Sequence, residues 1–384
     1  MAITFSKDIS TIKLLMAYNN NIVEFSSNST QVPIKCEVTG FNINAVIYPS
    51  PSGNFYFNLM EYIKAEINTN NFTDTIVPAL DGTNDDSFTY DSTDGHYLND
   101  TVLFKIIFDD ASFETASRDL KFLSGVEQLE SWKKNEILIA SANYMILSPV
   151  KDRTNNTTYL KYWDGYPFEF SFYTNYHHDN FKLINTTNAQ DYTFAAKGRV
   201  TSLYLSDGRT NETIENFLPL VDGLNVLRIE HDTVLQDPII NLRKEDSDCG
   251  IYIKFLNKYG KWNYWLFSEQ HYRNRATRYE SELGNDFKNI SETVSPTLQS
   301  GKTASDSIKC YYEKLNEEER TILDGIIESP KILLFTGERF SKAEPSDWIE
   351  VTLKGNSFQL KKPKTNFYNI ELEFELPNRY GLKL

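Results

Sequence analysis

Residues 248–267 read DCGIYIKFLNKYGKWNYWLF, which is the pattern of two strands joined by a tight turn. The first strand alternates apolar and other side chains along Ile251, Tyr252, Ile253, Lys254 and Phe255. This period of two predicts a strand with one buried face and one wet face. Residues 257–260 supply the turn, because Gly260 reaches positive φ without a steric penalty.

The second strand of this hairpin concentrates aromatic side chains. It holds two of the five tryptophans of the chain, and such density marks a packing centre or a contact face. The aromatic residues of the hairpin, together with one tryptophan further along the chain, are therefore our candidates for structural or interface contacts. These candidates are Trp262, Tyr264, Trp265, Phe267, Trp348 and Tyr252.

The length and composition of the chain predict a modular globular protein. A chain of 384 residues exceeds the usual size of a single core, so two or three domains are expected. Hydrophobic residues make up 40% of the chain and aromatic residues 14%, which is enough apolar material for folded cores. The 25 phenylalanines and 23 tyrosines favour β structure.

The charge of the chain argues against nucleic acid as a partner, and its lack of long apolar runs argues against a membrane. A net charge of −14 does not suit a nucleic-acid-binding surface, because neutralising phosphates requires clustered Lys and Arg. The chain has no run of about 18 apolar residues, so we expect no membrane-spanning helix. The first ten residues, MAITFSKDIS, lack the basic and apolar regions of a signal peptide. Synthesis in a cytoplasm is therefore expected.

A first β-rich domain is expected over residues 1–150. Short strands are predicted at residues 32–38 and 41–48, and a short helix is predicted at 60–67. Residues 81–95 form an acidic, polar loop in this interpretation. A further strand at 101–108 would bury alternate side chains, namely Val102, Phe104 and Ile106.

A second β-rich, sandwich-like domain is expected over residues 151–245. Phe168, Phe170 and Phe172 alternate with polar residues there, as in a strand. Residues 78–84 and 219–225 both read Pro-x-aliphatic-Asp-Gly-x-Asn. This echo suggests two related units. The first two domains are therefore predicted to be sandwich-like.

A third, α+β region is expected over residues 246–384. After the aromatic hairpin, residues 268–301 form a long polar arm without apolar periodicity, and long ordered loops often form interfaces. Asn316 can cap a short helix, with Glu319 at the capping-box position, and Pro330 ends it. Strands are expected at 331–335, 348–353, 357–360 and 368–376, the last with an apolar face and an acidic face.

No metal or cofactor site is predicted. The three cysteines, Cys36, Cys249 and Cys310, are far apart, so neither a disulfide framework nor a zinc site is expected. Residues 177–179 read His-His-Asp, but neighbouring strand residues point to opposite faces. Five aspartates in the acidic loop lack the spacing of a calcium-binding loop, and a solvated loop is favoured. These are Asp81, Asp85, Asp86, Asp91 and Asp94.

The chain carries no recognisable catalytic motif. Gly-x-Ser-x-Gly, Walker-type, His-Glu-x-x-His and Gly-x-Gly-x-x-Gly patterns are all absent from the sequence. The 53 acidic residues leave a glycosidase pair neither excluded nor locatable. A non-enzymatic protein is therefore expected, with polysaccharide cleavage as a weaker alternative.

The hairpin segment 249–267 resembles a segment of virion structural proteins from tailed phages that infect Bacteroidetes-type hosts. In both, a strand ending in Leu-Asn, a glycine-containing turn and an aromatic strand follow one another. The end of the chain, with Asp347-Trp348-Ile349-Glu350-Val351 and the strand 368–376, resembles the way such chains end. The likeness covers the last third of the chain and involves packing residues, so no functional residue carries over.

The resemblance implies a building block of the phage tail or its tip, of the distal-tail or baseplate type. Such a protein would assemble with copies of itself in a ring, dock other tail proteins and reside in the virion. The rival hypothesis is a glycan-binding receptor-recognition or adhesion module, with host surface glycan as the ligand. Its sugar platforms would be exposed aromatics such as Trp163, Tyr166 or Trp265.

Overall fold

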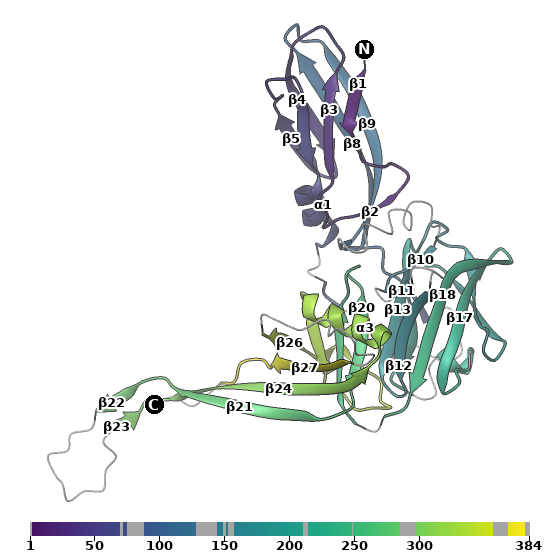
Figure 1. The fold of residues 1–384 in the computed structure, drawn as a ribbon, viewed down its shortest axis with the longest axis vertical. Helices are drawn as coiled ribbons and strands as arrows, with labels where there is room; N and C mark the ends of the chain where they lie inside the picture. Colours follow the sequence, from purple (N-terminus) through teal and green to yellow (C-terminus); the bar gives the residue numbers. More distant parts are fainter. Residues whose placement is uncertain are drawn as a thin grey trace, which may run out of the picture.

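The computed structural model describes residues 2–69, 72–74, 88–127, 144–148, 151–152, 157–209, 214–247, 249–284, 297–355 and 368–380. In these residues strands far outweigh the two α-helices, so the predicted mainly β fold class is confirmed. Figure 1 shows an N-terminal sandwich standing on a larger β-rich body, from which a narrow ribbon extends to one side.

The N-terminal sandwich consists of two facing sheets. The smaller sheet has the order β1-β3-β6, with β1 (Ile3–Lys7), β3 (Ile22–Ser27) and β6 (Phe55–Asn58). The larger sheet has the order β2-β9-β8-β4-β5, with β2 (Leu14–Met16), β9 (Phe113–Leu123), β8 (Tyr97–Phe108), β4 (Pro33–Gly40) and β5 (Ile43–Ile47). The Phe25 ring packs between the sheets, 5.0 Å from Phe104 and 5.4 Å from Phe55 between ring centroids.

Local patterns located several elements of this sandwich correctly. The predicted strands at 32–38 and 41–48 correspond to β4 and β5, and the predicted helix at 60–67 is α1 (Met60–Ile67). Val102, Phe104 and Ile106 are fully buried on β8, as their alternation predicted. Residues 81–87 of the predicted acidic loop lie outside the described residues, as does the first copy of the internal echo.

The body begins with two further sheets. The four-stranded sheet has the order β10-β13-β16-β7, with β10 (Tyr144–Ile146), β13 (Pro167–Thr174), β16 (Val200–Asp207) and β7 (Thr89–Asp91). The six-stranded sheet has the order β11-β12-β18-β17-β14-β15, with β11 (Lys151–Asp152), β12 (Thr157–Trp163), β18 (Val234–Glu245), β17 (Gly223–His231), β14 (Asn180–Asn185) and β15 (Gln190–Ala195). A short 3-10 turn, η2 (Ile214–Asn216), precedes β17.

The remaining part of the body is a seven-stranded sheet. Its order is β20-β19-β25-β26-β27-β24-β21, with β20 (Trp262–Phe267), β19 (Ile251–Leu256), β25 (Ile332–Phe335), β26 (Trp348–Lys354), β27 (Tyr368–Glu375), β24 (Lys302–Leu315) and β21 (His271–Tyr279). Helix α3 (Glu317–Glu328) packs against β19 and β24. A 3-10 turn, η3 (Pro345–Asp347), leads into β26.

One hydrophobic core joins the four-stranded and six-stranded sheets to the seven-stranded sheet. Trp163 of β12 and Trp265 of β20 meet in it edge to face, with ring centroids 5.3 Å apart. The four-stranded sheet also recruits β7 and β10, which precede residue 150 in the sequence. The predicted domain boundaries near residues 150 and 245 remain predictions, and the body packs across both.

The predicted hairpin at 248–267 is confirmed, but its burial differs from the prediction. Strands β19 and β20 pair in register from Ile251↔Phe267 to Leu256↔Trp262, and Gly260 has a φ of +71° in the turn. All six residues of β19 are buried, including Lys254, which was expected on a wet face. Helix α3 contacts β19, and β12 and β13 contact β20, so neither strand keeps an exposed sheet face.

The described parts of the predicted polar arm at 268–301, residues 268–284 and 297–301, belong to a two-stranded ribbon rather than a loop. Strand β21 pairs with β24 from His271↔Cys310 to Tyr279↔Lys302. Further out, β22 (Glu282–Gly284) pairs with β23 (Thr297–Gln299). All nine side chains of β21 are exposed. A ribbon with water on both faces has no need of alternating apolar residues, which is why the sequence pattern gave no strand signal.

The helix and strands predicted after the arm are largely confirmed. The Asn316 side chain accepts a hydrogen bond from the backbone N–H of Glu319, and the Glu319 carboxylate accepts one from the N–H of Asn316. Helix α3 ends at Glu328, before Pro330. Strand β27 buries Leu372 and Phe374 on one face. The strand predicted at 357–360 lies outside the described residues.

Candidate functional site

The six aromatic candidates lie at the centre of the body. Tyr252, Tyr264, Trp265 and Phe267 are buried, whereas Trp262 and Trp348 are half-buried. They pack within the chain, and the Tyr252 hydroxyl donates a 2.7 Å hydrogen bond to the carbonyl of Pro167 in β13. In the described structure these residues therefore join parts of one chain, and their role in contacts between copies stays a prediction.

The three aromatics proposed as sugar platforms are not accessible. Trp163 is 1% exposed, Tyr166 6% and Trp265 0%. Sugar stacking requires an open ring face, so the expectation that these side chains are exposed was wrong. Sequence density of aromatics could not distinguish a core from a binding surface, because both use the same residues.

The turn of the hairpin contacts the base of the N-terminal sandwich. The Ser124 hydroxyl donates to the carbonyl of Tyr259 at 3.2 Å, and the N–H of Val126 donates to the carbonyl of Lys258 at 2.7 Å. Asn257 shapes this turn, because its side-chain oxygen accepts from the N–H of Tyr259 at 2.8 Å. The hairpin thus connects the N-terminal sandwich to the body.

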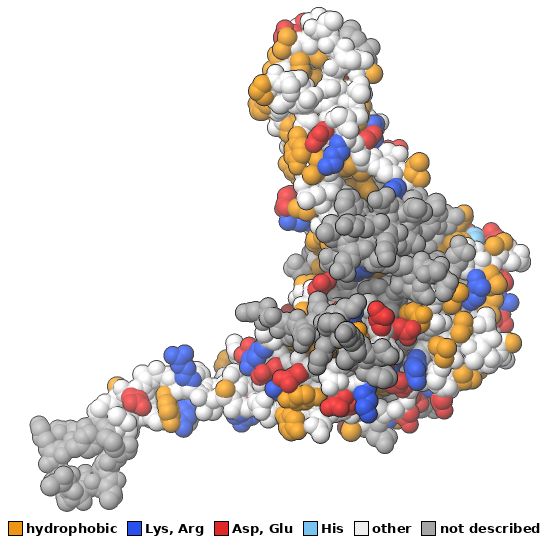
Figure 2. All heavy atoms as spheres, viewed as in Figure 1, with side chains coloured by type: hydrophobic (Ala, Val, Ile, Leu, Met, Phe, Trp, Pro, Cys, Tyr) orange, Lys and Arg blue, Asp and Glu red, His pale blue; other side chains and the backbone are white. Residues whose placement is uncertain are grey.

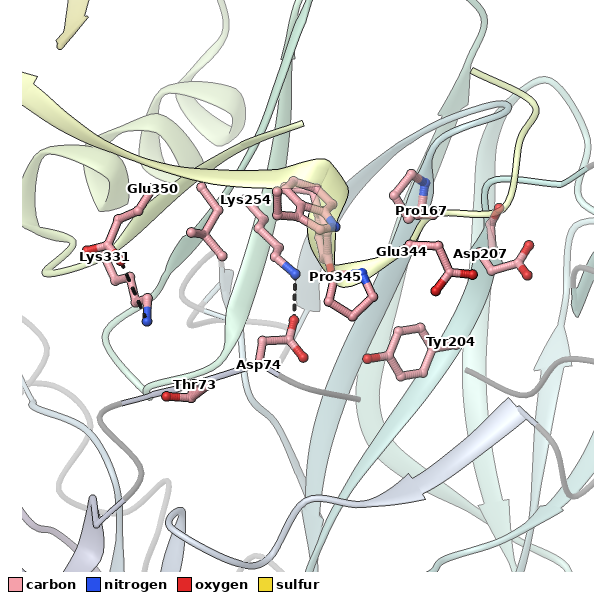
Figure 3. A pocket seen from close by; sticks show the side chains of 15 residues that line it. Thr73, Asp74, Pro167, Tyr204, Asp207, Lys254, Lys331, Glu344, Pro345 and Glu350 are labelled. Atoms are coloured by element: carbon pink, nitrogen blue, oxygen red, sulfur yellow. Dashed lines mark hydrogen bonds and ion pairs between the residues drawn. The ribbon is translucent and has the colours of Figure 1, made fainter. Parts of the chain in front are cut away.

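A cleft of about 220 Å³ opens beside the hairpin (Figure 3). Residues 73–74 line it from the side of the N-terminal sandwich, and strands β13 and β16 line it from the four-stranded sheet. Strands β19, β20, β25 and β26, together with η3, complete the wall. Three parts of the chain that are far apart in sequence therefore meet at one cavity.

The cleft is lined by paired charges. Lys254 Nζ lies 2.5 Å from Asp74 Oδ2 and 4.2 Å from the centroid of the Trp348 ring. Figure 3 shows the Lys254 and Asp74 side chains pointing toward one another at the floor of the cleft. At the rim, Lys331 Nζ lies 3.9 Å from Glu350 Oε2. Lys254 is almost fully buried, so its charge depends on Asp74 and the tryptophan face for stabilisation.

A smaller cavity of about 60 Å³ adjoins the cleft across Asp74 and Tyr204, which line both. Glu169 and Lys261 face it. Burial, reinforced by the charge of Asp74, raises the pKa of Glu169 to about 7. Burial lowers the pKa of Lys261 to about 8, against the opposing influence of Glu169. Burial also holds the pKa of His96 well below its usual range. Two of these three groups, Glu169 and Lys261, therefore have pKa values displaced toward neutral pH.

The sequence carries a signal for this cluster in two of its strands. Glu169 and Lys254 each interrupt an apolar strand, and the alternation around Lys254 predicts a wet face there. In the structure they are 5% exposed, since Asp74, Tyr204 and Lys261 surround them from other segments. A charged residue inside a strand that is otherwise continuously apolar could have indicated a buried ion pair.

The described residues contain no group of three His, Cys, Asp or Glu side chains placed to hold a metal ion. His177 and His178 lie in the turn between β13 and β14 rather than in a strand, and their rings are 4.9 Å apart. Nε2 of His231 instead lies 3.0 Å from Oδ2 of Asp179, which accepts the hydrogen bond. Of the five loop aspartates, Asp91 and Asp94 are within the described part.

The described helices are too short or too polar to cross a membrane. None of the residues that line the cleft is among the described residues with positive φ. The strained backbone conformations therefore lie elsewhere in the described structure. The arrangement offers hydrogen-bonding groups and a shaped wall.

No family model matches the chain, and no curated protein matches it. Among solved structures it is similar to fibronectin(III)-like modules of Clostridium thermocellum CbhA, at 6% identity and a TM-score of 0.20, over 63% of this chain and 94% of that one. It is also similar to a Ca²⁺-stabilised ice-binding adhesin of an Antarctic bacterium, at 7% identity and a TM-score of 0.19, over 97% of both chains. Scores this low indicate neither a shared overall arrangement nor a shared function.

Proposed function

We propose that this protein is a non-enzymatic structural component that associates with copies of itself through its ribbon arm. The arm consists of strands β21 to β23 and the outer part of β24, that is, the described residues 270–284 and 297–306. The observation that supports this proposal is the arm itself. It leaves the body with both faces in water, and β21 has no neighbour on its outer edge among the described strands.

A two-stranded ribbon that extends into solvent has little stability of its own. Strand β24 pairs with β27 only from Ser307 onward. Residues 302–306 of β24 therefore pair with β21 alone, and this part of the ribbon is two-stranded. An isolated two-stranded ribbon is marginally stable in water, and an open edge strand invites further pairing. Arg275 and Asp306 bridge the two strands with hydrogen bonds of 2.7 and 3.0 Å, but exposed pairs add little. Docking onto another chain would supply the missing burial.

The composition of β21 suits a protein interface. Its nine residues read HYRNRATRY, with three arginines, two tyrosines and no acidic residue. Arginine and tyrosine are enriched among residues that dominate binding energies. Tyr272 and Tyr279 are about half exposed, and Figure 2 shows basic and apolar side chains reaching solvent along the ribbon.

Charge complementarity favours a second copy as the occupant. The whole chain has a net charge of −14, so a strand with three arginines and no carboxylate is attracted to another copy of the same protein. Closed rings form when two different surfaces of each subunit are complementary. The basic strand β21 and the acidic body are two such surfaces.

The finer proposal is a tail or tail-tip ring protein of a phage virion, which also docks other tail components. Its support is the sequence resemblance of the last third of the chain. A long arm that reaches a neighbouring subunit, a modular β architecture and a chain without a catalytic motif are all compatible with that role.

The charge of the arm provides the first test. Arg273→Glu combined with Arg278→Glu should weaken self-association at least tenfold, because the arm would then carry acids toward an acidic body. Raising the salt concentration should weaken the wild-type association in the same direction, since exposed charges are screened over about 10 Å at 0.1 M. Sedimentation velocity across a concentration series measures both effects.

A matched control separates the arm from apolar surface elsewhere. Tyr48→Ala with Phe113→Ala removes two exposed aromatics from the N-terminal sandwich, where they are 72% and 62% exposed. This variant should associate like the wild type. Loss of association in the control, with association retained in the arginine variant, would contradict the proposal.

A further inference from the structure

The cleft beside the hairpin is electrically balanced. Each of its four carboxylates has a cationic partner: Asp74 with Lys254, Asp207 with Arg209, Glu344 with Lys342 and Glu350 with Lys331. The corresponding nitrogen–oxygen distances are 2.5, 2.7, 3.3 and 3.9 Å. A charged ligand would have to displace one of these partners, whereas a neutral ligand would leave all four pairs in place.

The balanced charges still offer many hydrogen-bonding atoms. A carboxylate has about four acceptor sites, and an ammonium group has three donors, so the rim pair of Lys331 and Glu350, whose glutamate side chain is 66% exposed, can still bond a ligand. Tyr204 lines the same wall, and its hydroxyl also bonds Glu169 in the neighbouring cavity. A ligand that both donates and accepts hydrogen bonds at several adjacent positions would use this wall best.

The rest of the wall is apolar. Pro167, Pro345, Leu333 and Ala343 line it together with the ring of Trp348. Pro345 and Tyr204 both face the cavity in Figure 3. The cavity volume of about 220 Å³ lies below the 300–1,000 Å³ typical of sites for drug-sized ligands. The size therefore suits a ligand of one ring.

We propose that this cleft binds a single neutral sugar residue, either free or at the end of a glycan. The hydroxyls of such a ring donate to the paired carboxylates and accept from the lysines, while its C–H face lies against the proline and tryptophan side chains. Ligand sites of this mixed character are common in proteins. The site is distinct from the ribbon arm, so the proposal goes beyond the assembly function and does not depend on it.

Saturation-transfer NMR on the full-length protein tests the proposal. The probes are four neutral monosaccharides, namely glucose, galactose, N-acetylglucosamine and rhamnose, each at several times a Kd of about 1 mM, the scale of a weak small-ligand site. At least one should show transfer from the wild type. Ala343→Phe fills the cleft without removing a charge and should abolish that transfer, whereas Ala276→Phe on the exposed arm should leave it unchanged.

A second variant protects the test against misfolding. Glu350 has a side chain that is 66% exposed, so Glu350→Gln should fold normally, yet it loses the charge of one acceptor in the cleft. We expect its sugar affinity to fall severalfold. Absence of transfer from all four sugars to the wild type would overturn the proposal, as would unchanged binding in both Ala343→Phe and Glu350→Gln.

Discussion

Lys161 in β12 and Glu319 in α3 form a buried ion pair, with 2.7 Å between Nζ and Oε1. The pair ties the six-stranded sheet to the helix of the seven-stranded sheet. Nζ of Lys161 also lies 5.3 Å from the Trp163 ring centroid and 5.2 Å from that of Trp265. The same Glu319 completes the capping box of α3 through Oε2. One glutamate therefore serves both helix initiation and the joint between the two parts of the body.

Removal of the lysine should be costly. Lys161→Ala leaves Glu319 without its cation in a site where the glutamate side chain is 17% exposed, and breaking a buried pair costs about 3–5 kcal/mol. Because Glu319 keeps some contact with water, we expect a loss near the lower end. Urea unfolding monitored by tryptophan fluorescence measures it.

The exposed pair between Lys182 and Asp191 is the control for this prediction. Its side chains are 40% and 45% exposed, so Lys182→Ala should change the free energy of unfolding far less than Lys161→Ala does. Equal losses in the two variants would mean that the buried pair contributes no more than a surface pair.

The N-terminal cap of α3 should contribute measurably to stability. Asn316→Ala removes the acceptor for the N–H of Glu319, which lies 2.8 Å away, and the loss of a cap costs about 1 kcal/mol. Asn316→Asp keeps an acceptor and should unfold close to the wild type. A wild-type midpoint for Asn316→Ala in thermal unfolding would show that the cap is redundant.

Glu169 should make stability depend on pH. Its pKa of about 7 in the folded chain exceeds the ordinary value of 4.5, so the folded state binds this proton more tightly than the unfolded state. The stability from this group is therefore fully present below pH 4.5 and lost as the pH rises through 7. Asp74, Tyr204, Lys261 and Lys254 are the groups that face it.

Glu169→Gln isolates this contribution, because glutamine has the same shape and does not titrate in this range. The melting temperature of the wild type minus that of Glu169→Gln should fall as the pH is raised from 4.5 to 7. A difference that grows over the same window would mean that Glu169 is held ionised in the folded protein.

Substitution of Gly260, in the turn of the hairpin, by alanine should destabilise the protein more than the same substitution at Gly53. A Cβ added at Gly260, where φ is +71°, would lie 2.8 Å from Ser124 Oγ. At Gly53, with a φ of +80°, a Cβ would meet nothing within 4 Å. Both alanine variants carry the backbone cost of about 1–2 kcal/mol for a left-handed residue, but Gly260→Ala also strains the contact with the sandwich.

Hydrogen exchange gives the readout for these two variants. Gly260→Ala should speed exchange at the N–H of Val126, which donates to Lys258 in the turn, whereas Gly53→Ala should not. Equal protection of Val126 in both variants would indicate that the turn does not hold the sandwich to the body.

Local sequence patterns predicted the elements whose determinants lie within a few residues. The capping box of Asn316 and Glu319 specified the start of α3, and the Asn257–Gly260 turn specified the central hairpin. The alternation around Leu372 predicted β27 and its buried face. Each of these depends on spacing along the chain, so no knowledge of distant segments was needed.

Burial and the cleft could not be predicted, because they depend on distant partners. Lys254 pairs with Asp74, which lies 180 positions away, and nothing near Lys254 distinguishes this arrangement from a wet strand face. The pairing of the strands in the arm could not be predicted for a different reason. With water on both faces of β21, its sequence needs no periodicity.

The most direct test of the proposed function is the solution mass of the protein with its full arm and with the outer part of the arm removed. In the truncated variant, an Asn-Gly turn replaces residues 277–304, which keeps the rung between Arg275 and Asp306 and closes the strands with a two-residue hairpin. Light scattering across a concentration series should give the full-length protein a multiple of the 44.4 kDa chain mass, and the folded truncated variant the mass of one chain. A full-length protein that stays at the mass of one chain, or a truncated variant that still forms the same multiple, would contradict assembly through the arm.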